Sequence, residues 1–322
     1  PKAKLVASTA TVRRSNEQVG RLYGRRVALF PPPGVEANET FFAHVGTEGA
    51  RQYVGVGAPG RPLKTTLLQV YVALLAAAQR GLVEHGEVAD AYLSLVGYFN
   101  SLRELGGMRR LVEDEVRRLV MRRHERVPER FDGESPWFAP RTIRAEPVEL
   151  TSREKTSAIK DSKDRLALEH GNDRAVDVVL ASNMISVGVD IDRLGLMVVA
   201  GQPKTTAEYI QASSRVGRNA GRPGLVVTCF NLAKPRDRSH YERFDAYHAS
   251  FYRFVEATSV TPFSAPALDR GLAGVVVGLS RLLTAGMTAP FDMMKVAEHR
   301  TTLEQQLEQV ARRAGAGERD EA

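Results

Sequence analysis

Cysteine is almost absent from this sequence of 322 residues, which has one, Cys229. A single thiol cannot build a disulfide framework or a zinc site made of several cysteines. Cys229 lies in the apolar stretch Leu225 to Phe230, so we expect a buried thiol and a reducing cytoplasm. The seven histidines are scattered without the spacing of metal ligands, and we predict no metal site in this chain.

Long hydrophobic runs are also missing. The longest, Val70 to Ala78 and Leu272 to Leu279, fall short of the roughly 20 apolar residues that a membrane-spanning helix needs. The N-terminus has no signal-peptide pattern. Hydrophobic residues still make up 43% of the chain, enough for a sizeable core, and the length suits about two domains. We expect a globular protein without a membrane partner.

A P-loop is the third absence. The pattern G-x-x-x-x-G-K-[ST] needs a glycine directly before its lysine, because bare backbone must wrap the phosphates. The nearest string, Gly60 to Thr65, has Leu63 at that position. We therefore expect that this chain alone does not hydrolyse ATP.

Basic side chains outnumber acidic ones, 45 to 38, and the net charge is +7. This charge favours a polyanion such as nucleic acid as partner, although it also serves solubility. Arg236, Arg238 and Arg243 form a dense basic stretch that either lines a nucleic-acid channel or is a solvated face.

Apolar runs of strand length alternate with helical patterns over residues 51–235, which predicts an α/β domain with a mainly parallel sheet. Residues 127–147, with four prolines, predict an ordered insertion or a long loop. After Asn231 the alternation stops, and residues 236–322 predict a C-terminal helical extension. The predicted strands are 53–57, 93–100, 147–151, 176–182, 196–200 and 225–230, and the predicted helices are 63–80, 102–123, 155–170, 207–216, 238–257, 265–284 and 292–313.

The stretch QASSRVGRNAGR, Gln211 to Arg222, is rich in arginine and small residues. Thr205 and Glu208 form a capping-box pattern, which predicts a helix that runs into this stretch. On that helix Gln211, Arg215 and Arg218 would project from one face, at positions i, i+4 and i+7. The alternative is a basic surface helix whose arginines are solvated.

The stretch ASNMISVGVDIDRLG, Ala181 to Gly195, follows a predicted strand. Ligands collect at the carboxyl ends of parallel strands. The spacing of Ser182, Gly188 and Asp190 fits a loop that contacts a phosphate backbone at its start and a nucleotide at its end.

Together, SNMISVGVD and QASSRVGR resemble motifs V and VI of superfamily 2 helicases, in the second of their two RecA-like lobes. The run from Asn183 through GLMVVAGQPKTTAEYIQASSRVGR and the later SHYERFDAYHASFYRFVEATSVTPFSAPALDRGL are similar to the large helicase subunit of the DISARM anti-phage defence system. This resemblance covers residues 181–272. It implies a RecA-like parallel sheet flanked by helices, the P-loop NTPase fold, and an ATP-dependent helicase or translocase.

The resemblance also implies partners and cofactors. ATP with Mg²⁺ would be held by a P-loop in a first lobe that this chain lacks, and residues 1–50 would be the end of that lobe and a connector. DNA, single-stranded or with a single-stranded overhang, would be the substrate. A companion subunit and a DNA methyltransferase would belong to the same system.

Residue roles follow from the same resemblance. Arg215 and Arg218 would reach the ATP phosphates as arginine fingers, and Gln211 would orient the arginines or the water. Gly188 and Asp190 would contact the nucleotide, with Asp190 either bonding the ribose or holding an arginine. Ser182 and Asn183 would face the nucleic-acid backbone.

Two earlier stretches resemble further helicase motifs. Asn100 and Ser101, between a predicted strand and a helix, are similar to motif IV and could hold a phosphate. The alternative is a simple N-cap. Ser8, Thr9 and Thr11 are similar to motif III, which couples hydrolysis to strand movement, although short Ser/Thr runs are also common in turns.

Two other classes of protein stay open as hypotheses. A non-catalytic RecA-like module would bind nucleic acid or a partner without turnover, but it has no need of paired arginines. A nucleotide-binding oxidoreductase would use Gly55, Gly57 and Gly60 as a G-x-G-x-x-G turn, but no acidic residue near position 80 is placed to bind a ribose. The aromatic residues at helical spacing between Tyr241 and Phe254 are interpreted as packing.

Overall fold

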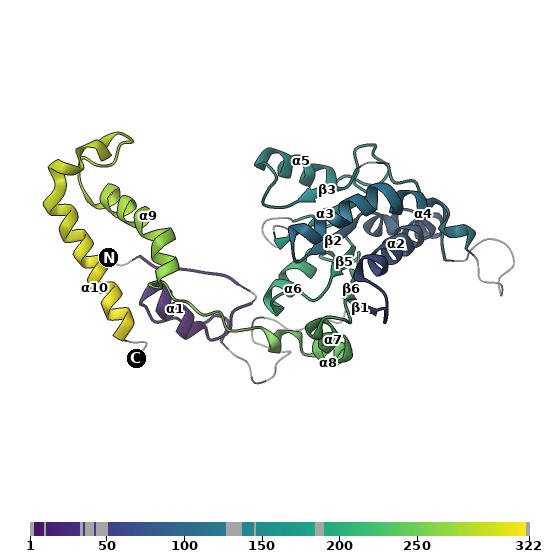
Figure 1. Ribbon diagram of the computed structural model, residues 1–322, viewed down its shortest axis with the longest axis horizontal. Helices are drawn as coiled ribbons and strands as arrows, with labels where there is room; N and C mark the ends of the chain where they lie inside the picture. Colours follow the sequence, from purple (N-terminus) through teal and green to yellow (C-terminus); the bar gives the residue numbers. More distant parts are fainter. Residues whose placement is uncertain are drawn as a thin grey trace. The chain divides into compact units, whose positions relative to one another are not determined.

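The chain divides into two compact units, which are drawn in Figure 1. The computed structural model describes residues 3–9, 11–32, 35, 42, 51–126, 137–144, 146–183 and 190–319. One unit spans residues 35–256 and contains the sheet, whereas the other joins residues 1–34 to residues 257–322. The domain boundaries predicted at residues 50 and 235 stay predictions; the sheet unit of the structure runs on to Glu256.

Six parallel strands form one sheet in the order β1-β6-β5-β2-β4-β3. Strands β2, β4 and β5 are buried along their whole length, as expected for strands covered on both faces. Each predicted strand is confirmed, with ends that shift by up to two residues. The strands are β1 (Gln52–Gly57), β2 (Leu95–Phe99), β3 (Val148–Leu150), β4 (Val178–Ala181), β5 (Leu196–Ala200) and β6 (Leu225–Phe230).

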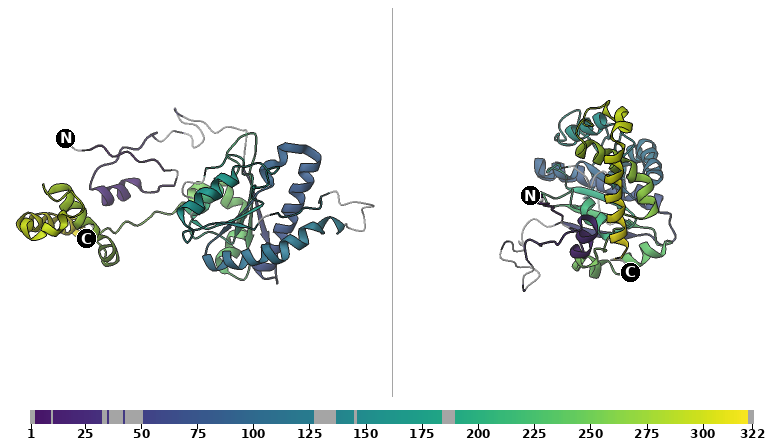
Figure 2. Two further views of the ribbon diagram at one scale, coloured as in Figure 1. Left: turned by 90° about the horizontal axis from the view of Figure 1, so that it is seen from above. Right: turned by 90° about the vertical axis from the view of Figure 1, so that its left-hand side faces the viewer.

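Helices cover both faces of this sheet (Figure 2). Side chains alternate between the faces along each strand, so Leu95 and Phe99 join one core whereas Val96 and Tyr98 join the other. The first core contains α2 (Leu63–His85), α3 (Leu102–Leu111) and α4 (Arg117–Met121), the last two being joined through a π-helical turn, Val112–Val116. The second contains α5 (Thr156–Leu166), α6 (Thr206–Ser213) and α8 (Phe244–Ala249). The layers are those of a RecA-like lobe.

The helical stretch Leu63–Tyr92, which is α2 with the 3₁₀ turn that follows it, is long and apolar enough to cross a membrane by length and composition alone. Its residues Leu67, Tyr71 and Leu75 recur every four positions and are buried in the first core. The apolar stripe is therefore explained by packing against the sheet.

Two buried ion pairs tie loops to the sheet unit. The Arg193 guanidinium donates to both carboxylate oxygens of Asp90, at 2.9 and 3.1 Å, and to the Leu166 carbonyl at 2.9 Å. Arg141, at 1% side-chain exposure, pairs with Asp177 at 2.7 Å. Arg141 belongs to the described end of the predicted insertion, which is thus packed into the unit.

The prediction of one helix over residues 238–257 is wrong. The chain forms α7 (Pro235–Glu242), α8 and a 3₁₀ turn, Phe251–Phe254. It turns at Arg243 and Ser250, whose dihedral angles lie outside the helical region (φ −117°, ψ 26° and φ −131°, ψ 38°). Of the aromatic residues interpreted as packing, Tyr247 and Phe251 are buried, but Tyr241 is 37% exposed.

The second unit is helical. It contains α1 (Ser15–Tyr23), α9 (Ala265–Leu283), a 3₁₀ segment (Asp292–His299) and α10 (Arg300–Arg319). A cavity of about 130 Å³ is lined by Arg14, Glu17, Gln18 and Arg21 from one chain segment and by residues 257–260 from the other. Two segments far apart in sequence therefore meet in this unit.

Candidate nucleotide and nucleic-acid sites

A cavity of about 160 Å³ lies at the carboxyl ends of β2 and β4. Parallel strands end at the same edge of a sheet, which brings residues far apart in the sequence together there. The four residues predicted to contact nucleic acid all line this cavity, although the structure leaves their roles as predictions. The lining is Phe99, Asn100, Ser101, Leu102, Ser152, Ser182, Asn183, Lys204 and Glu208.

Asn100 and Ser101 both make contacts within the protein. The Asn100 amide nitrogen donates to the carbonyls of Ala200, at 3.1 Å, and Gln202, at 3.2 Å, which joins the ends of β2 and β5. Its amide oxygen is buried and accepts no hydrogen bond from the described residues. The Ser101 hydroxyl accepts from the Glu104 amide at 3.3 Å, so Ser101 is the N-cap of α3. The capping alternative holds, and the hydroxyl proton is still available for a phosphate.

Ser182 and Asn183 continue directly from β4. The Ser182 amide donates to the Leu150 carbonyl at 3.3 Å, and its hydroxyl donates to the Asn183 amide oxygen at 3.4 Å. Ser182 is 8% exposed, whereas Asn183 is exposed to solvent. The pair thus offers one anchored and one accessible polar group beside the cavity.

Sequence reasoning missed Lys204 and Glu208 as cavity residues. Lys204 is exposed and lies in the loop between β5 and α6, so a lysine just after a predicted strand was the available signal. Glu208 accepts a hydrogen bond from the Tyr98 hydroxyl. Burial and the Glu208 carboxylate both raise the pKa of Tyr98. The predicted cap is confirmed, because the Glu208 amide donates to the Thr205 hydroxyl at 3.1 Å.

The arginines do not lie on the helix as predicted. Helix α6 ends at Ser213, so Arg215 and Arg218 lie in the turn that follows, and the prediction of one helical face is wrong. Tertiary contacts hold the turn after the helix: the Arg51 side chain donates to the Val216 carbonyl at 2.6 Å and to the Ser214 carbonyl at 3.3 Å. Gln211 is exposed on the last turn of α6.

Gly217 fixes the turn between the two arginines. Its φ is +63°, in the left-handed region that favours glycine, and its amide donates to the Leu194 carbonyl at 2.8 Å. A Cβ at this position would lie 2.3 Å from the Gly224 nitrogen. The backbone therefore passes where only a glycine fits, and Arg218 follows directly.

Arg218 forms an ion pair with Asp190, with 2.8 Å between Nη1 and Oδ1. The side chains are 34% and 64% exposed, so the pair contributes little stability and instead orients the guanidinium. Asp190 thus contacts an arginine, as one of its two predicted roles requires, and its contact with a ribose stays a prediction. Gly188 lies outside the described residues.

Arg215 is partly buried near this pair. Burial and the nearby Arg218 guanidinium lower the pKa of Arg215, against the opposite effect of Asp190. An anion beside both guanidinium groups would relieve this repulsion, and a phosphate fits their planar fork. The residues present therefore suit a phosphate group.

Three further predictions concern other parts of the chain. Ser8, Thr9 and Thr11 lie in the helical unit, where the Thr11 amide donates to the Thr9 hydroxyl at 3.2 Å. Among the described residues, no three His, Cys, Asp or Glu side chains gather as metal ligands. Gly55 and Gly57 lie within β1 rather than in a turn, so they do not form a dinucleotide-binding loop.

Comparison with known proteins agrees with this arrangement. Residues 143–220 match the family of the helicase conserved C-terminal domain. Helicase Lhr of Mycobacterium smegmatis, solved with single-stranded DNA and AMP-PNP, has the same fold, with a TM-score of 0.50 and 15% identity over 85% of this chain and 29% of that one. The family match and the fold are those of a helicase C-terminal domain, which is a RecA-like lobe.

Two proteins of known sequence are also similar to this chain. The DISARM protein DrmA of Bacillus paralicheniformis is 44% identical over 291 residues, which are 87% of this chain and 25% of DrmA. The ATP-dependent RNA helicase DDX50 of Mus musculus is 31% identical over 26% of this chain and 11% of its own length. The chain thus spans about a quarter of the length of DrmA.

Proposed function

We propose that this chain supplies the second lobe of an ATP-dependent translocase that acts on DNA, single-stranded or with a single-stranded overhang, in anti-phage defence. The similarity to DrmA supports the defence role, and the DNA-bound relative Lhr supports the substrate. The observation that carries the proposal is the grouping of Asn100, Ser101, Ser182 and Asn183 around one cavity whose lining does not include the two arginines. On this basis we propose that strand contact and nucleotide contact belong to different residues.

The arginines would act on the phosphates of ATP. The printed sequence has no P-loop, so the P-loop and the Mg²⁺ site would belong to another lobe of the complete protein. Mg²⁺ would neutralise phosphate charge there. In this chain, Arg218 would stabilise the charge that develops on the transferred phosphoryl group, Asp190 would orient Arg218, and Gln211 would orient the arginines or the water.

The cavity residues would hold the sugar-phosphate backbone. Ser101 and Asn183 offer a hydroxyl and an amide, and Lys204 adds a positive charge at the same edge. Opening and closing of the lobes in each ATP cycle would then move the strand.

The thiol of Cys229 is buried, and burial raises its pKa to about 12, which suits a reducing cytoplasm as the location of the protein. A companion subunit is expected by similarity to the DISARM system.

The test is Arg218→Ala in the complete protein. We expect the ATPase rate to fall by about two or more orders of magnitude, since arginine fingers contribute about 10³ to 10⁵ in rate. Nucleotide affinity should fall much less, because the finger acts on transition-state charge. Arg218→Lys should restore little activity, since it loses the planar fork.

Arg80→Ala is the matched control. Arg80 also forms an exposed ion pair, at 2.7 Å with Glu84, but on α2. It should leave turnover unchanged. A folded Arg218→Ala protein with unaltered steady-state turnover would contradict the proposal and favour the second candidate, a non-catalytic RecA-like module, which the lack of a P-loop pattern in the chain supports.

A further inference from the structure

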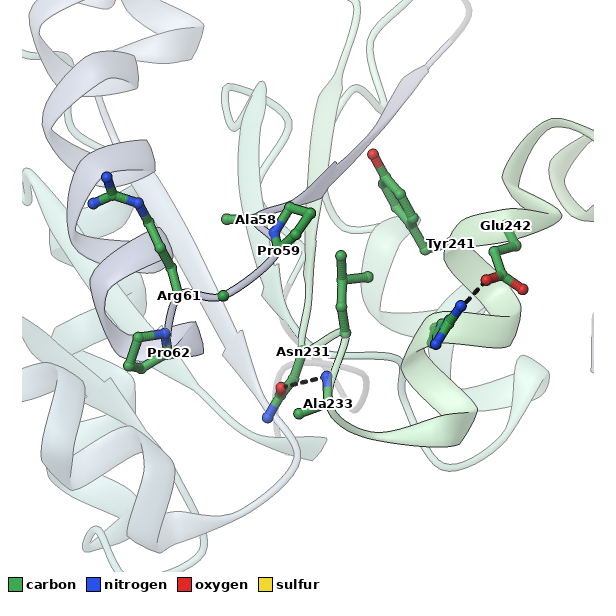
Figure 3. Close-up of a pocket in the computed structure, with 11 residues that line it drawn as sticks. Ala58, Pro59, Arg61, Pro62, Asn231, Ala233, Tyr241 and Glu242 are labelled. Carbon is green, nitrogen blue, oxygen red and sulfur yellow. Dashed lines mark hydrogen bonds and ion pairs between the residues drawn. The ribbon is translucent and has the colours of Figure 1, made fainter.

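A larger cavity, of about 790 Å³, lies between two turns of the sheet unit (Figure 3). One turn joins β1 to α2, and the other joins β6 to α7. The volume falls in the range of about 300–1,000 Å³ that is usual for ligand sites. Its lining is Ala58, Pro59, Gly60, Arg61, Pro62, Asn231, Leu232, Ala233, Arg238, Tyr241 and Glu242.

The Tyr241 ring is built into this cavity. It packs beside Phe230, with 5.7 Å between ring centroids and 58° between ring planes. Gly57 makes room for the ring, because a Cβ there would lie 3.0 Å from Tyr241 and 3.1 Å from Leu232. The ring is nevertheless 37% exposed. Tyr241 is thus fixed on one side and accessible on the other, as a stacking platform requires.

Two arginines, Arg61 and Arg238, line the same cavity as the ring. Arg61 is exposed at the rim and has no carboxylate partner among the described residues. Arg238 pairs with Glu242 at 2.8 Å, but both side chains are more than half exposed. Solvent screens such a pair, so a phosphate can compete for the arginine.

The two cavities lie along one edge of the sheet. β1 and β6 end at the larger cavity, and β2 and β4 end at the smaller one. Neighbouring strands are about 4.8 Å apart. In the sheet order, β2 lies two strands from β6 and three strands from β1, so the distance between the two cavities is roughly 10–15 Å. Lys234, which pairs with Glu104 at 3.5 Å, and Arg236, which donates to the Gln202 carbonyl, lie on the stretch between them.

We propose that the larger cavity is a second contact for the same nucleic-acid strand, in which a base stacks on Tyr241 while Arg61 and Arg238 bind flanking phosphates. The span between the cavities corresponds to about three or four stacked nucleotides at roughly 3.4 Å each. This inference rests on the proposed function and extends the strand contact beyond the four predicted residues.

The experiment measures fluorescence anisotropy of the complete protein with a labelled oligothymidylate and with a strand of equal length that carries abasic sugars. Tyr241→Ala should weaken oligothymidylate binding by about tenfold, within the range known for one stacked base. Tyr241→Phe keeps the ring and should bind normally. Removal of the bases should cost less affinity in Tyr241→Ala than in the unaltered protein, because the stacked partner is already lost. Tyr252→Ala, which truncates a 64% exposed tyrosine outside the cavity, is the control.

The outcomes separate this inference from the proposed function. If Tyr241→Ala binds both strands like the unaltered protein while Ser182→Ala with Asn183→Ala weakens both, the larger cavity is not a strand contact but the proposed function stands. If Tyr241→Ala binds both strands normally but no longer binds a protein partner, the inference is also wrong. If Tyr241→Ala does not fold, Arg61→Glu decides: unaltered affinity would refute the contact, and several-fold weaker binding would support it. Failure of the unaltered protein to bind either strand would refute the proposed function itself.

Discussion

Substitution of Gly217 by alanine should destabilise the sheet unit and displace the turn that carries Arg215 and Arg218. The left-handed conformation costs an alanine roughly 1–2 kcal/mol. The new Cβ would also lie 2.3 Å from the nitrogen and 2.5 Å from the Cα of Gly224, which are backbone atoms that cannot rotate away. Relief of such overpacking costs about 1–3 kcal/mol. We therefore expect a loss of about 3 kcal/mol.

For a unit of this size, that loss corresponds to a fall of about 6–12 °C in Tm. The assay is a thermal melt of the complete protein, with steady-state ATPase measured below the transition. Gly221→Ala is the matched control, because it lies in the same turn, its φ is not in the left-handed region, and its Cβ would meet a side-chain atom, Asn219 Oδ1, at 3.4 Å. Equal melting temperatures for the two variants would refute the reasoning, since the two backbone constraints would then carry no cost.

Four further outcomes are expected. Arg193→Ala should lower the free energy of unfolding by about 3–5 kcal/mol in urea titrations, because it leaves the buried Asp90 carboxylate without its partner; a change below about 1 kcal/mol would contradict this. Burial alone would raise the pKa of Asp90, but Arg193 and the His170 amide lower it below the value in the unfolded chain. The ionised Asp90 therefore stabilises the fold above the unfolded-chain pKa of about 3.9, and this stabilisation is lost as the pH falls below that value. The variant Asp90→Asn should not show this loss of stability at low pH. In the complete protein, Ser182→Ala with Asn183→Ala should keep basal ATPase but lose strand movement in a translocation assay; loss of basal ATPase as complete as in Arg218→Ala would contradict the division of roles. Binding of single-stranded DNA should weaken linearly in a plot of log affinity against log salt, by about 0.7 per phosphate contact, and a flat line would exclude phosphate contacts.

Much of the fold could be predicted because it is encoded locally. The strands are short apolar runs bounded by turn residues, and the Thr205 cap that starts α6 lies beside its helix. The parallel arrangement then placed Asn100 and Ser182 at one edge without any knowledge of contacts. These parts depend on the order of residues more than on distant partners.

The parts that could not be predicted depend on contacts distant in sequence or on single residues that form no pattern. The turn after α6 is bound by Arg51, which contacts Val216 across 165 positions of sequence, and local periodicity, which carries no sign of this contact, extended the helix too far. Tyr241 packs beside Phe230, in line with its interpretation as packing, but it is 37% exposed because the turn at Arg243 separates its environment from that of Tyr247 and Phe251. Lys204 was missed because a single lysine carries no pattern.

The helical unit has a consequence for synthesis on the ribosome. Its cavity joins Arg14 to Arg21 with residues 257–260, so the whole sheet unit is made between the two halves of the helical one. At about 5–20 residues per second, the intervening stretch of roughly 230 residues takes about 10–50 s to emerge. Helix α1 can contact residues 257–260 only after that time, whereas the sheet unit can fold as it leaves the ribosome tunnel. In the order of synthesis, the contact between α1 and residues 257–260 therefore forms only after the whole sheet unit has been made.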